Sequence, residues 1–178
     1  MNQTDLLISP FRKEESPLSA TAGKDETRYA MQHLAARDGS IYATNGRILA
    51  VYPDRANGGD AHEEAVLPRE VVQAATKGAQ RAAIEVEGDS ATSHTKAGTV
   101  SGSLVKREFP RCKAVIDGLP EAEHEVHLDG DLLISLLKAI GGVKGRAVKL
   151  RLPKDPHHPL RVETDDAWGV IMPMAKER

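Results

Sequence analysis

Short runs in which apolar and polar residues alternate recur along the chain, which is the pattern of half-buried β-strands. The clearest alternation lies in residues 148–152 and 160–163. The dipeptides Asp38-Gly39 and Asn45-Gly46 are hairpin-turn signals and join the early strands into a meander. A polar loop is expected over residues 55–64. We expect strands over residues 28–34, 40–44, 47–52, 65–67, 82–86, 91–94, 99–105, 126–128, 148–152, 160–163 and 168–172.

Two segments have the signals of a helix. Residues 69–77 follow Pro68, which suits a first helical turn, and precede Gly78, a helix stop. A second helix is expected after Asp129, whose carboxylate would cap it, and before Gly141. One face of this second helix is apolar and is formed by Leu132, Leu133, Leu136, Leu137 and Ile140.

Matching landmarks indicate an internal repeat. Gly78 and Gly141 are 63 residues apart, and so are Pro110 and Pro173. The order of elements is α+β and predicts two βαβββ repeats, with two helices on one face of antiparallel sheets and extra N-terminal strands. The first repeat with those strands would occupy residues 1–118 and the second residues 119–178, as two domains or one continuous domain.

The composition and the distribution of charge limit how the protein could bind nucleic acid. The chain of 178 residues is 40% hydrophobic and 28% charged, which is typical of globular proteins. A formal net charge of −2 argues against a protein that coats nucleic acid through bulk charge. Residues 138–161 nevertheless contain seven Lys or Arg and one acidic residue. Such a local surface would suit a weak phosphate contact or, equally, simple solvation.

The sequence lacks the patterns of several other classes of protein. Cys112 is the only cysteine, which excludes an internal disulfide and a CxxC metal site. No apolar run approaches the roughly 20 residues of a membrane helix, and the N-terminus lacks a signal-peptide pattern, so a cytoplasmic location is expected. No nucleophile, phosphate-loop or zinc motif occurs, so we expect no enzyme, cofactor or metal. An α+β enzyme would need a site near His124 and His127.

Three stretches resemble the bacterial β sliding clamp of the replicative DNA polymerase. Residues 43–50, ATNGRILA, are similar to the clamp's ATDGHRLA hairpin. VLPREVV at 66–72 with EFPR at 108–111 is similar to its "LPRK…FPDY" helix start and strand end. VIMPM at 170–174 is similar to its C-terminal VVMPM. All three occur in the order of the family, between about residues 25 and 174.

The chain also departs from the family. A clamp subunit has three domains, each a pair of βαβββ units, and this chain is about half that length. Asn45 stands where the family has Asp, and Arg47-Ile48 where it has His-Arg. The resemblance therefore covers the end of a middle domain and the second half of a last domain.

The resemblance implies a pocket for partner peptides and a surface for DNA. Flexible methionines suit a pocket that accepts several apolar anchors, although Met172 and Met174 could instead fill the core. The implied pocket comprises Thr44, Gly46, Arg47, Ile48, Leu49, Leu132, Val170, Ile171, Met172, Pro173 and Met174. The implied contacts to DNA phosphates, which would be nonspecific, are Lys77, Lys138, Lys144, Arg146 and Lys149.

The function that the resemblance implies is that of a non-enzymatic replication or repair accessory protein, a processivity factor. It would tether a DNA polymerase or repair protein, through a short hydrophobic clamp-binding motif, to duplex DNA. Encircling DNA with one repeat pair per chain requires a homo-oligomer ring. The alternative is a monomeric adaptor or decoy that binds clamp-motif peptides without encircling DNA.

Overall fold

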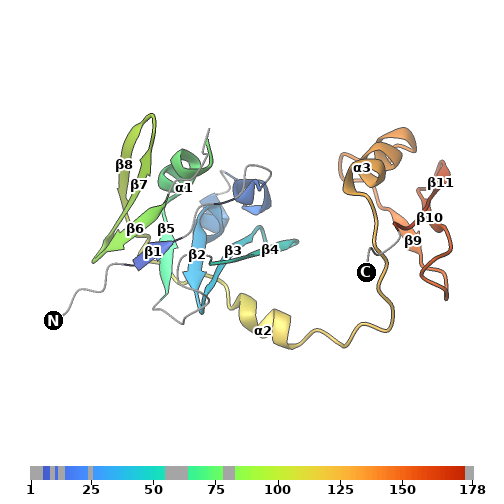
Figure 1. Ribbon diagram of the computed structural model, residues 1–178, viewed down its shortest axis with the longest axis horizontal. Helices are drawn as coiled ribbons and strands as arrows, with labels where there is room; N and C mark the ends of the chain where they lie inside the picture. The colour runs from blue at the N-terminus through green and yellow to red at the C-terminus, as the bar shows by residue number, and fades with distance from the viewer. Residues whose placement is uncertain are drawn as a thin grey trace. The chain divides into compact units, whose positions relative to one another are not determined.

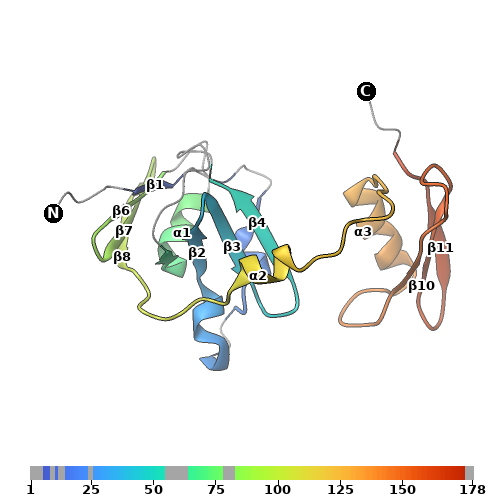
Figure 2. The same ribbon diagram turned by 90° about the horizontal axis from the view of Figure 1, so that it is seen from below.

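The computed structural model describes residues 6–8, 11, 15–23, 26–54, 64–77 and 83–174. The chain forms two compact units, Met1–Gly118 and Leu119–Arg178. None of the helices in the described ranges is long and apolar enough to cross a lipid bilayer. Both units combine antiparallel strands with helices (Figures 1 and 2).

Two four-stranded antiparallel sheets form the first unit, with the orders β4-β3-β2-β5 and β1-β6-β7-β8. Its strands are β1 (Leu6–Ile8), β2 (Leu34–Arg37), β3 (Ser40–Thr44), β4 (Leu49–Pro53), β5 (Ala65–Leu67), β6 (Ile84–Glu87), β7 (Ser90–Thr95) and β8 (Gly98–Ser103). Its helices are the 3₁₀ segments η1 (Pro17–Ala20) and η2 (Glu26–Gln32) and the α-helices α1 (Arg69–Thr76) and α2 (Cys112–Asp117).

The two sheets of the first unit exchange strands. β1 precedes β2-β3-β4 in the chain but pairs with β6, and β5 precedes β6-β7-β8 but pairs with β2. Each three-stranded meander therefore receives its fourth strand from the other half of the unit. The shared core joins Leu34 and Ile41 of one sheet to Val71 of α1 and Ile84 of the other sheet, all nearly inaccessible to solvent. Burying a side chain of this kind stabilises the fold by about 1.5–3 kcal/mol.

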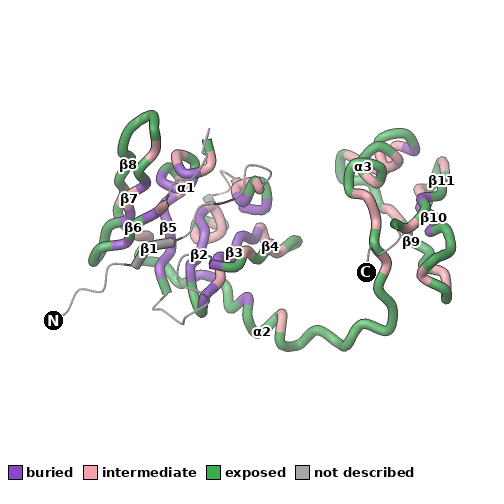
Figure 3. Tube along the Cα trace, in the orientation of Figure 1, coloured by how far each residue is buried: buried purple, intermediate pink, exposed green. Residues whose placement is uncertain are grey.

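The second unit is a single layer of sheet covered by one helix. It contains α3 (Gly130–Ala139), β9 (Lys149–Arg151), β10 (Leu160–Glu163) and β11 (Trp168–Ile171). The strands form an antiparallel sheet of order β11-β10-β9. Leu160, Val162 and Ile171 are buried under α3, but no residue of α3 itself is fully buried. Figure 3 shows the contrast, with buried residues along α1, β2, β3 and β5 of the first unit and mostly exposed residues along α3.

The same module occurs in both units. In the first, β5 leads into α1 and then into the meander β6-β7-β8, after which Val105 donates its N–H to the carbonyl of Val66 (3.0 Å). In the second, residues 126–128 lead into α3 and then into β9-β10-β11, after which Met174 donates its N–H to the carbonyl of His127 (2.8 Å). The predicted α+β class with antiparallel sheets is confirmed.

Several local predictions agree with the structure. Asp129 caps α3, because its carboxylate accepts hydrogen bonds from the N–H groups of Asp131 and Leu132. The turn Asp38-Gly39 links β2 to β3, and both residues have the positive φ that such a two-residue hairpin turn requires (50° and 68°). The predicted loop over 55–64 and the helix stop at Gly78 lie outside the described residues, apart from Glu64.

Other local predictions were wrong. Residues 28–34 were expected to form a strand, but they mostly belong to η2, and β2 begins only at Leu34. Tertiary contacts explain the difference, since the guanidinium of Arg28 binds the carbonyl of Asn45 and the carbonyl of Met31 accepts the N–H of Ala22. The sequence also did not predict β1 or α2. Residues 126–128 are not a regular strand, although His127 bonds to Met174 as a strand neighbour would.

Candidate protein-interaction and DNA-contact sites

The turn between β3 and β4 is held by side-chain hydrogen bonds. The buried hydroxyl of Thr44 donates to the carbonyl of Ile48 (2.6 Å) and accepts the N–H of Gly46 (3.0 Å). The side-chain oxygen of Asn45 accepts the N–H groups of Arg47 (2.9 Å) and Ile48 (3.0 Å). Together they fix a four-residue loop between the paired residues at its ends, longer than a two-residue Asn-Gly turn.

Two residues of η2, Arg28 and Met31, pack against this turn. The Arg28 guanidinium donates to the carbonyl of Asn45 (2.6 Å). Gly46 has a φ of +82°, and a Cβ at this position would lie 3.4 Å from Arg28 and 3.7 Å from the sulfur of Met31. Glycine therefore satisfies both the left-handed backbone and the close approach of η2.

The turn presents an apolar surface to solvent. Ile48 is half exposed, and Leu49 is partly buried against the cluster that contains Tyr42 and Phe109. We call Thr44 to Leu49, with Arg28 and Met31, the hairpin surface. The sequence did not indicate Arg28 and Met31 as site residues. It predicted a strand over residues 28–34, whereas both residues lie in η2, beside the turn. Their proximity to Gly46 is a tertiary contact that the sequence does not show.

A surface cleft adjoins η2 in the first unit. It has a volume of about 680 Å³ and is lined by residues 27–31, residues 106–108 and Pro110. The Arg107 guanidinium lies 5.5 Å from the centre of the Tyr29 ring, on the wall of the cleft. Arg28 and Met31 belong both to this cleft and to the hairpin surface. A peptide that contacts the hairpin surface thus has an adjacent recess in the same unit.

In the second unit, β11 directs alternate side chains to opposite faces of the sheet. Ile171 is buried in the core, and Gly169 approaches Leu136 of α3. Trp168, Val170 and Met172 alternate with these residues and are each more than half exposed. We call these three residues the outer strip. Ile171 thus packs into the core beneath the strand, whereas the predicted pocket residues Val170 and Met172 extend into solvent on the other face.

The remaining predicted pocket residues of this unit lie at two further places. Met174 is more than half exposed and lines a small pocket of about 160 Å³ with Glu125, His127, Pro156 and His157. Pro173, which joins this pocket to the outer strip, is partly exposed. Leu132 is exposed on α3, the helix that covers the face of the sheet opposite to the outer strip. Leu132 and the outer strip therefore come from different sides of the same sheet.

Charged residues border the outer strip. The carboxylate of Glu163 lies 2.8 Å from the Arg151 guanidinium and 2.7 Å from that of Arg161. The hydrogen bond from Arg151 lowers the pKa of Glu163 from its ordinary value, and the positive charges around it act in the same direction. Arg161 also lies over the Trp168 ring, 4.5 Å from its centre, which is a cation–π geometry. The strip is thus flanked by a basic cluster with one carboxylate at its centre.

The five predicted DNA-contact residues are all exposed and are divided between the two units. Lys77 follows α1 in the first unit, while the other four belong to the second. Lys138 lies in the last turn of α3. Lys149 pairs across the sheet with Glu163 and faces away from the side that α3 covers. Lys144 lies in the loop between them.

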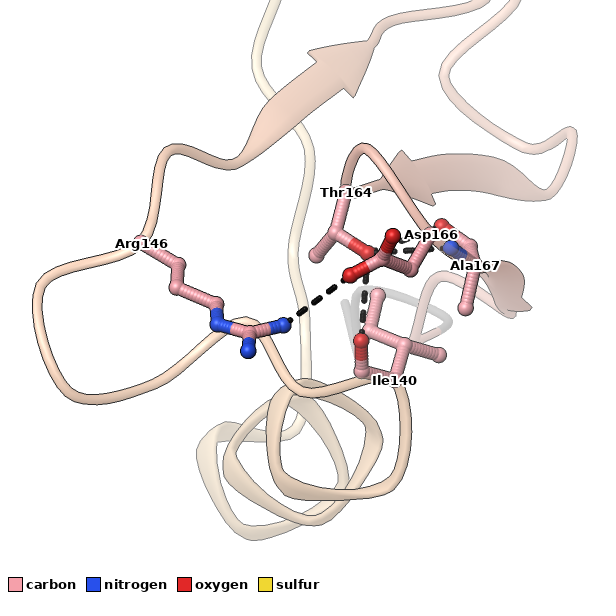
Figure 4. Close-up of polar contacts among 5 residues, drawn as sticks. All are labelled: Ile140, Arg146, Thr164, Asp166 and Ala167. Carbon is pink, nitrogen blue, oxygen red and sulfur yellow. Dashed lines mark hydrogen bonds and ion pairs between the residues drawn. The ribbon is translucent and has the colours of Figure 1, made fainter.

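Arg146 already has a carboxylate partner. Its guanidinium lies 3.1 Å from Asp166 in the turn between β10 and β11 (Figure 4). In the same turn the hydroxyl of Thr164 lies 3.1 Å from the carbonyl oxygens of Ile140 and Ala167 and ties the end of α3 to the sheet. A phosphate would have to compete with Asp166 for Arg146. Both side chains are largely exposed, so that competition is weak.

The structure offers no support for a metal centre near the histidines. Among the described residues, no group of three or more His, Cys, Asp or Glu side chains is arranged to hold a metal ion. His127 lines the small pocket beside Met174, and its carbonyl oxygen accepts a hydrogen bond from the N–H of Met174.

No protein-family model and no curated protein matches the chain. Its structure, however, is similar to those of bacterial sliding clamps. The Bacillus subtilis DNA polymerase sliding clamp matches with a TM-score of 0.65 at 13% identity, over 97% of this chain and 50% of the clamp. The Bartonella birtlesii sliding clamp bound to griselimycin matches with a TM-score of 0.62 at 18% identity, over 99% and 53%. The C. crescentus beta sliding clamp, with polyethylene glycol at a proposed beta-motif tethering region, matches with a TM-score of 0.60 at 18% identity, over 86% and 45%.

These matches show that the chain has the fold of bacterial DNA polymerase III beta sliding clamps, as its sequence motifs predicted. The chain spans about half the length of each clamp.

Proposed function

We propose that this chain is a non-enzymatic, clamp-like accessory protein of DNA replication or repair that binds short apolar segments of partner proteins. Two separate surfaces are proposed to bind partner peptides: the hairpin surface of the first unit, and the outer strip of the second unit with Pro173 and Met174. The proposed partners are a DNA polymerase or a repair protein with a hydrophobic clamp-binding motif.

The observation that carries this proposal is the hairpin surface. Its turn is fixed by four side-chain hydrogen bonds, so little conformational entropy remains to be lost when a ligand binds. It exposes Ile48, and its residues Arg28 and Met31 also line a cleft of about 680 Å³, a size that accommodates several peptide side chains. The clamp from Bartonella birtlesii binds griselimycin, and half of that clamp has the fold of this chain.

The exposed methionines of the second unit also support binding of apolar peptide segments. Met172 and Met174 are exposed and flexible, which suits a surface that accepts Leu or Phe anchors of different shape. Each anchor that becomes buried would contribute about 1.5–3 kcal/mol to binding. The alternative from the sequence, that both methionines fill the core, disagrees with their exposure.

Fluorescence anisotropy with a labelled peptide that carries Leu and Phe anchors tests the proposal. Removing an apolar contact with Met172→Ala or Leu49→Ala should weaken binding by about tenfold or more. Val115→Ala, at an apolar position on α2 that is as exposed as Met172, serves as the matched control and should leave affinity unchanged. Equal affinities for wild-type protein and both variants would refute the peptide function.

DNA contact is the second part of the proposal and would be nonspecific. Lys77, Lys138, Lys144, Arg146 and Lys149 are the proposed phosphate contacts, and their affinity should fall steeply with salt. If the protein forms a ring around DNA, closed circular duplex should retain it and linear duplex should release it.

A monomeric adaptor or decoy is the competing function, and one observation favours it. The cationic side chains of the second unit are divided between α3 and the opposite face of the sheet, and Arg146 is paired with Asp166. Peptide binding without any salt-sensitive retention on circular DNA would select the adaptor over the clamp.

A further inference from the structure

We propose that the second unit pairs with the second unit of another copy of this chain, each inserting its segment 126–128 beside β9 of the other. The contact would be twofold symmetric and would complete a two-sheet domain of the kind that the first unit forms within one chain. This inference goes beyond the proposed function and does not depend on peptide binding.

The first unit supplies the template. There, the strand before each meander adds to the first strand of the other meander, so that β1 lies beside β6 and β5 beside β2. Both pairs are antiparallel and have matching registers. Ile8 lies opposite Ile84, and Leu67 lies opposite Leu34. The arrangement is that of two modules that each cover the open edge of the other.

The second unit contains the same module once, and its residues can be matched to those of the first. Pro68 and Asp129 are the N-caps of α1 and α3, which makes Leu132 the equivalent of Val71. The bonds Val105–Val66 and Met174–His127 align the ends of the two meanders.

The cross-strand pairs extend this match to the first strand of each meander. With the ends aligned, the pair Ile84–Ser93 matches Leu150–Val162, since Ser93 and Val162 are equivalent, fully buried positions. Leu150 is therefore the equivalent of Ile84, and Leu152 that of Val86.

Equivalent positions differ sharply in exposure. Val71, Ile84 and Val86 are 0%, 1% and 7% exposed. Leu132, Leu150 and Leu152 are 59%, 53% and 60% exposed. In the first unit, Leu34, Ile41 and their neighbours on the other meander cover this apolar face. The core of the second unit is built from one module alone, so the same face remains open.

The backbone of the second unit also has an open position, at the edge of its sheet. Within the described part of the chain, β9 is the outermost strand of its sheet, and its outer edge has no strand neighbour. An exposed strand edge flanked by apolar side chains is a template for pairing with another chain. The segment 126–128 is the equivalent of β5, and its side chains are partly exposed whereas β5 is fully buried.

Charge complementarity favours a second copy as the occupant of this edge. The segment that would insert is preceded by Glu121, Glu123 and Glu125. The edge that would receive it carries Lys149 and Arg151, and Lys154 follows, against a single acidic residue, Asp155. The template register places Leu128 opposite Leu150, His127 opposite Arg151 and Val126 opposite Leu152, so the acidic segment then runs toward Lys154. A twofold axis fills both edges at once, as an isologous contact does.

The oligomeric state of the full chain gives the first test. Sedimentation equilibrium should show a reversible monomer–dimer equilibrium. Leu152→Glu should weaken the dimer by about 100-fold or more, because each dimer contains two copies of the altered contact. The matched control Val115→Glu places the same charge at an equally exposed site on α2 and should not change the mass. A wild-type monomer up to the limit of solubility overturns the inference.

Cross-linking tests the register itself. The double variant H127C/R151C places two cysteines directly opposite each other across the proposed strand pair, within reach of a disulfide. Oxidation should give covalent dimers in high yield, with no longer polymers, because a twofold contact closes on itself. The single variants control for the native Cys112 and should not cross-link. A dimer that forms without this cross-link, or that survives Leu152→Glu, uses another surface and refutes the proposed pairing.

Loss of peptide binding is distinguishable from loss of the dimer. Met172→Ala alters the outer strip on the opposite face of the sheet and should leave the monomer–dimer equilibrium unchanged. Leu152→Glu should retain its circular dichroism spectrum, because Leu152 is already exposed in the single chain.

Discussion

The amide of Met174 donates a hydrogen bond of 2.8 Å to the carbonyl oxygen of His127. This bond holds the chain after β11 against the segment that leads into α3. It keeps Met174 on a wall of the small pocket of the second unit while its side chain remains exposed. The corresponding bond between Val105 and Val66 in the first unit shows that both modules are closed by the same contact.

Removing the hydroxyl of Thr44 should loosen the turn between β3 and β4. Thr44→Val keeps the shape of the side chain but leaves the carbonyl of Ile48 and the N–H of Gly46 without their partner. We expect a loss of about 1–3 kcal/mol in the free energy of unfolding, measured by urea denaturation. Thr92→Val removes a hydroxyl whose bond to Ser101 is exposed and should cost much less. Equal losses of unfolding free energy in the two variants would contradict the prediction that the Thr44 hydroxyl stabilises the turn more than an exposed hydroxyl does.

Two glycines allow a matched test of the hairpin surface. Gly46→Ala forces alanine into a φ of +82° beside Arg28 and Met31 and should destabilise the first unit by about 1 kcal/mol. It should also weaken peptide binding, since the turn must move. Gly130→Ala adds a methyl with no heavy atom within 4 Å at the start of α3 and should be neutral or stabilising. Thermal unfolding and peptide anisotropy measure both effects, and the prediction fails if the two variants behave alike.

The N-cap of α3 should control the stability of that helix. Asp129→Ala removes the acceptor for the N–H groups of Asp131 and Leu132 and should cost about 1 kcal/mol. Hydrogen exchange of the α3 amides is the appropriate measurement, because it reports on the second unit separately. The exposed Asp165→Ala, in the turn between β10 and β11, is the control, and its α3 amides should exchange as in the wild type.

Acid should destabilise the first unit through His33. Burial lowers the pKa of this imidazole from its ordinary value, since the charged form is poorly solvated there. Its Nδ1 accepts the N–H of Arg69 (3.1 Å), and its Nε2 bonds to no described residue. The unfolded chain therefore binds the proton more readily, and the free energy of unfolding should decrease as the pH falls from about 7.5 to about 5.

A His33→Gln variant should show a smaller pH dependence over the same range, and the exposed His124→Gln should keep that of the wild type. Urea denaturation at each pH provides the measurement. A wild-type stability that rises on acidification would contradict the lowered pKa of His33.

The sequence by itself determined the local elements and the fold class. Alternation specified β10 to the residue, Asp129 specified the start of α3, and Asp38-Gly39 specified a turn. These features are local, because they depend on the conformational preferences of a few adjacent residues and on the period of the apolar pattern. The ordered motifs predicted the fold of the sliding clamps for the same reason, since each is a contiguous stretch.

The tertiary structure alone decided which elements pair and which faces remain open. The exchange of β1 and β5 joins residues far apart in the chain, and nothing in Leu6–Ile8 specifies Ile84–Glu87 as its neighbour. Arg28 and Met31 became part of the hairpin surface through contacts with Asn45 and Gly46 that no local pattern encodes. Leu132 and Leu150 have ordinary core patterns in the sequence, and their exposure follows only from the absence of a covering module in the described second unit. Burial depends on what packs opposite a residue, and that is a property of the whole fold.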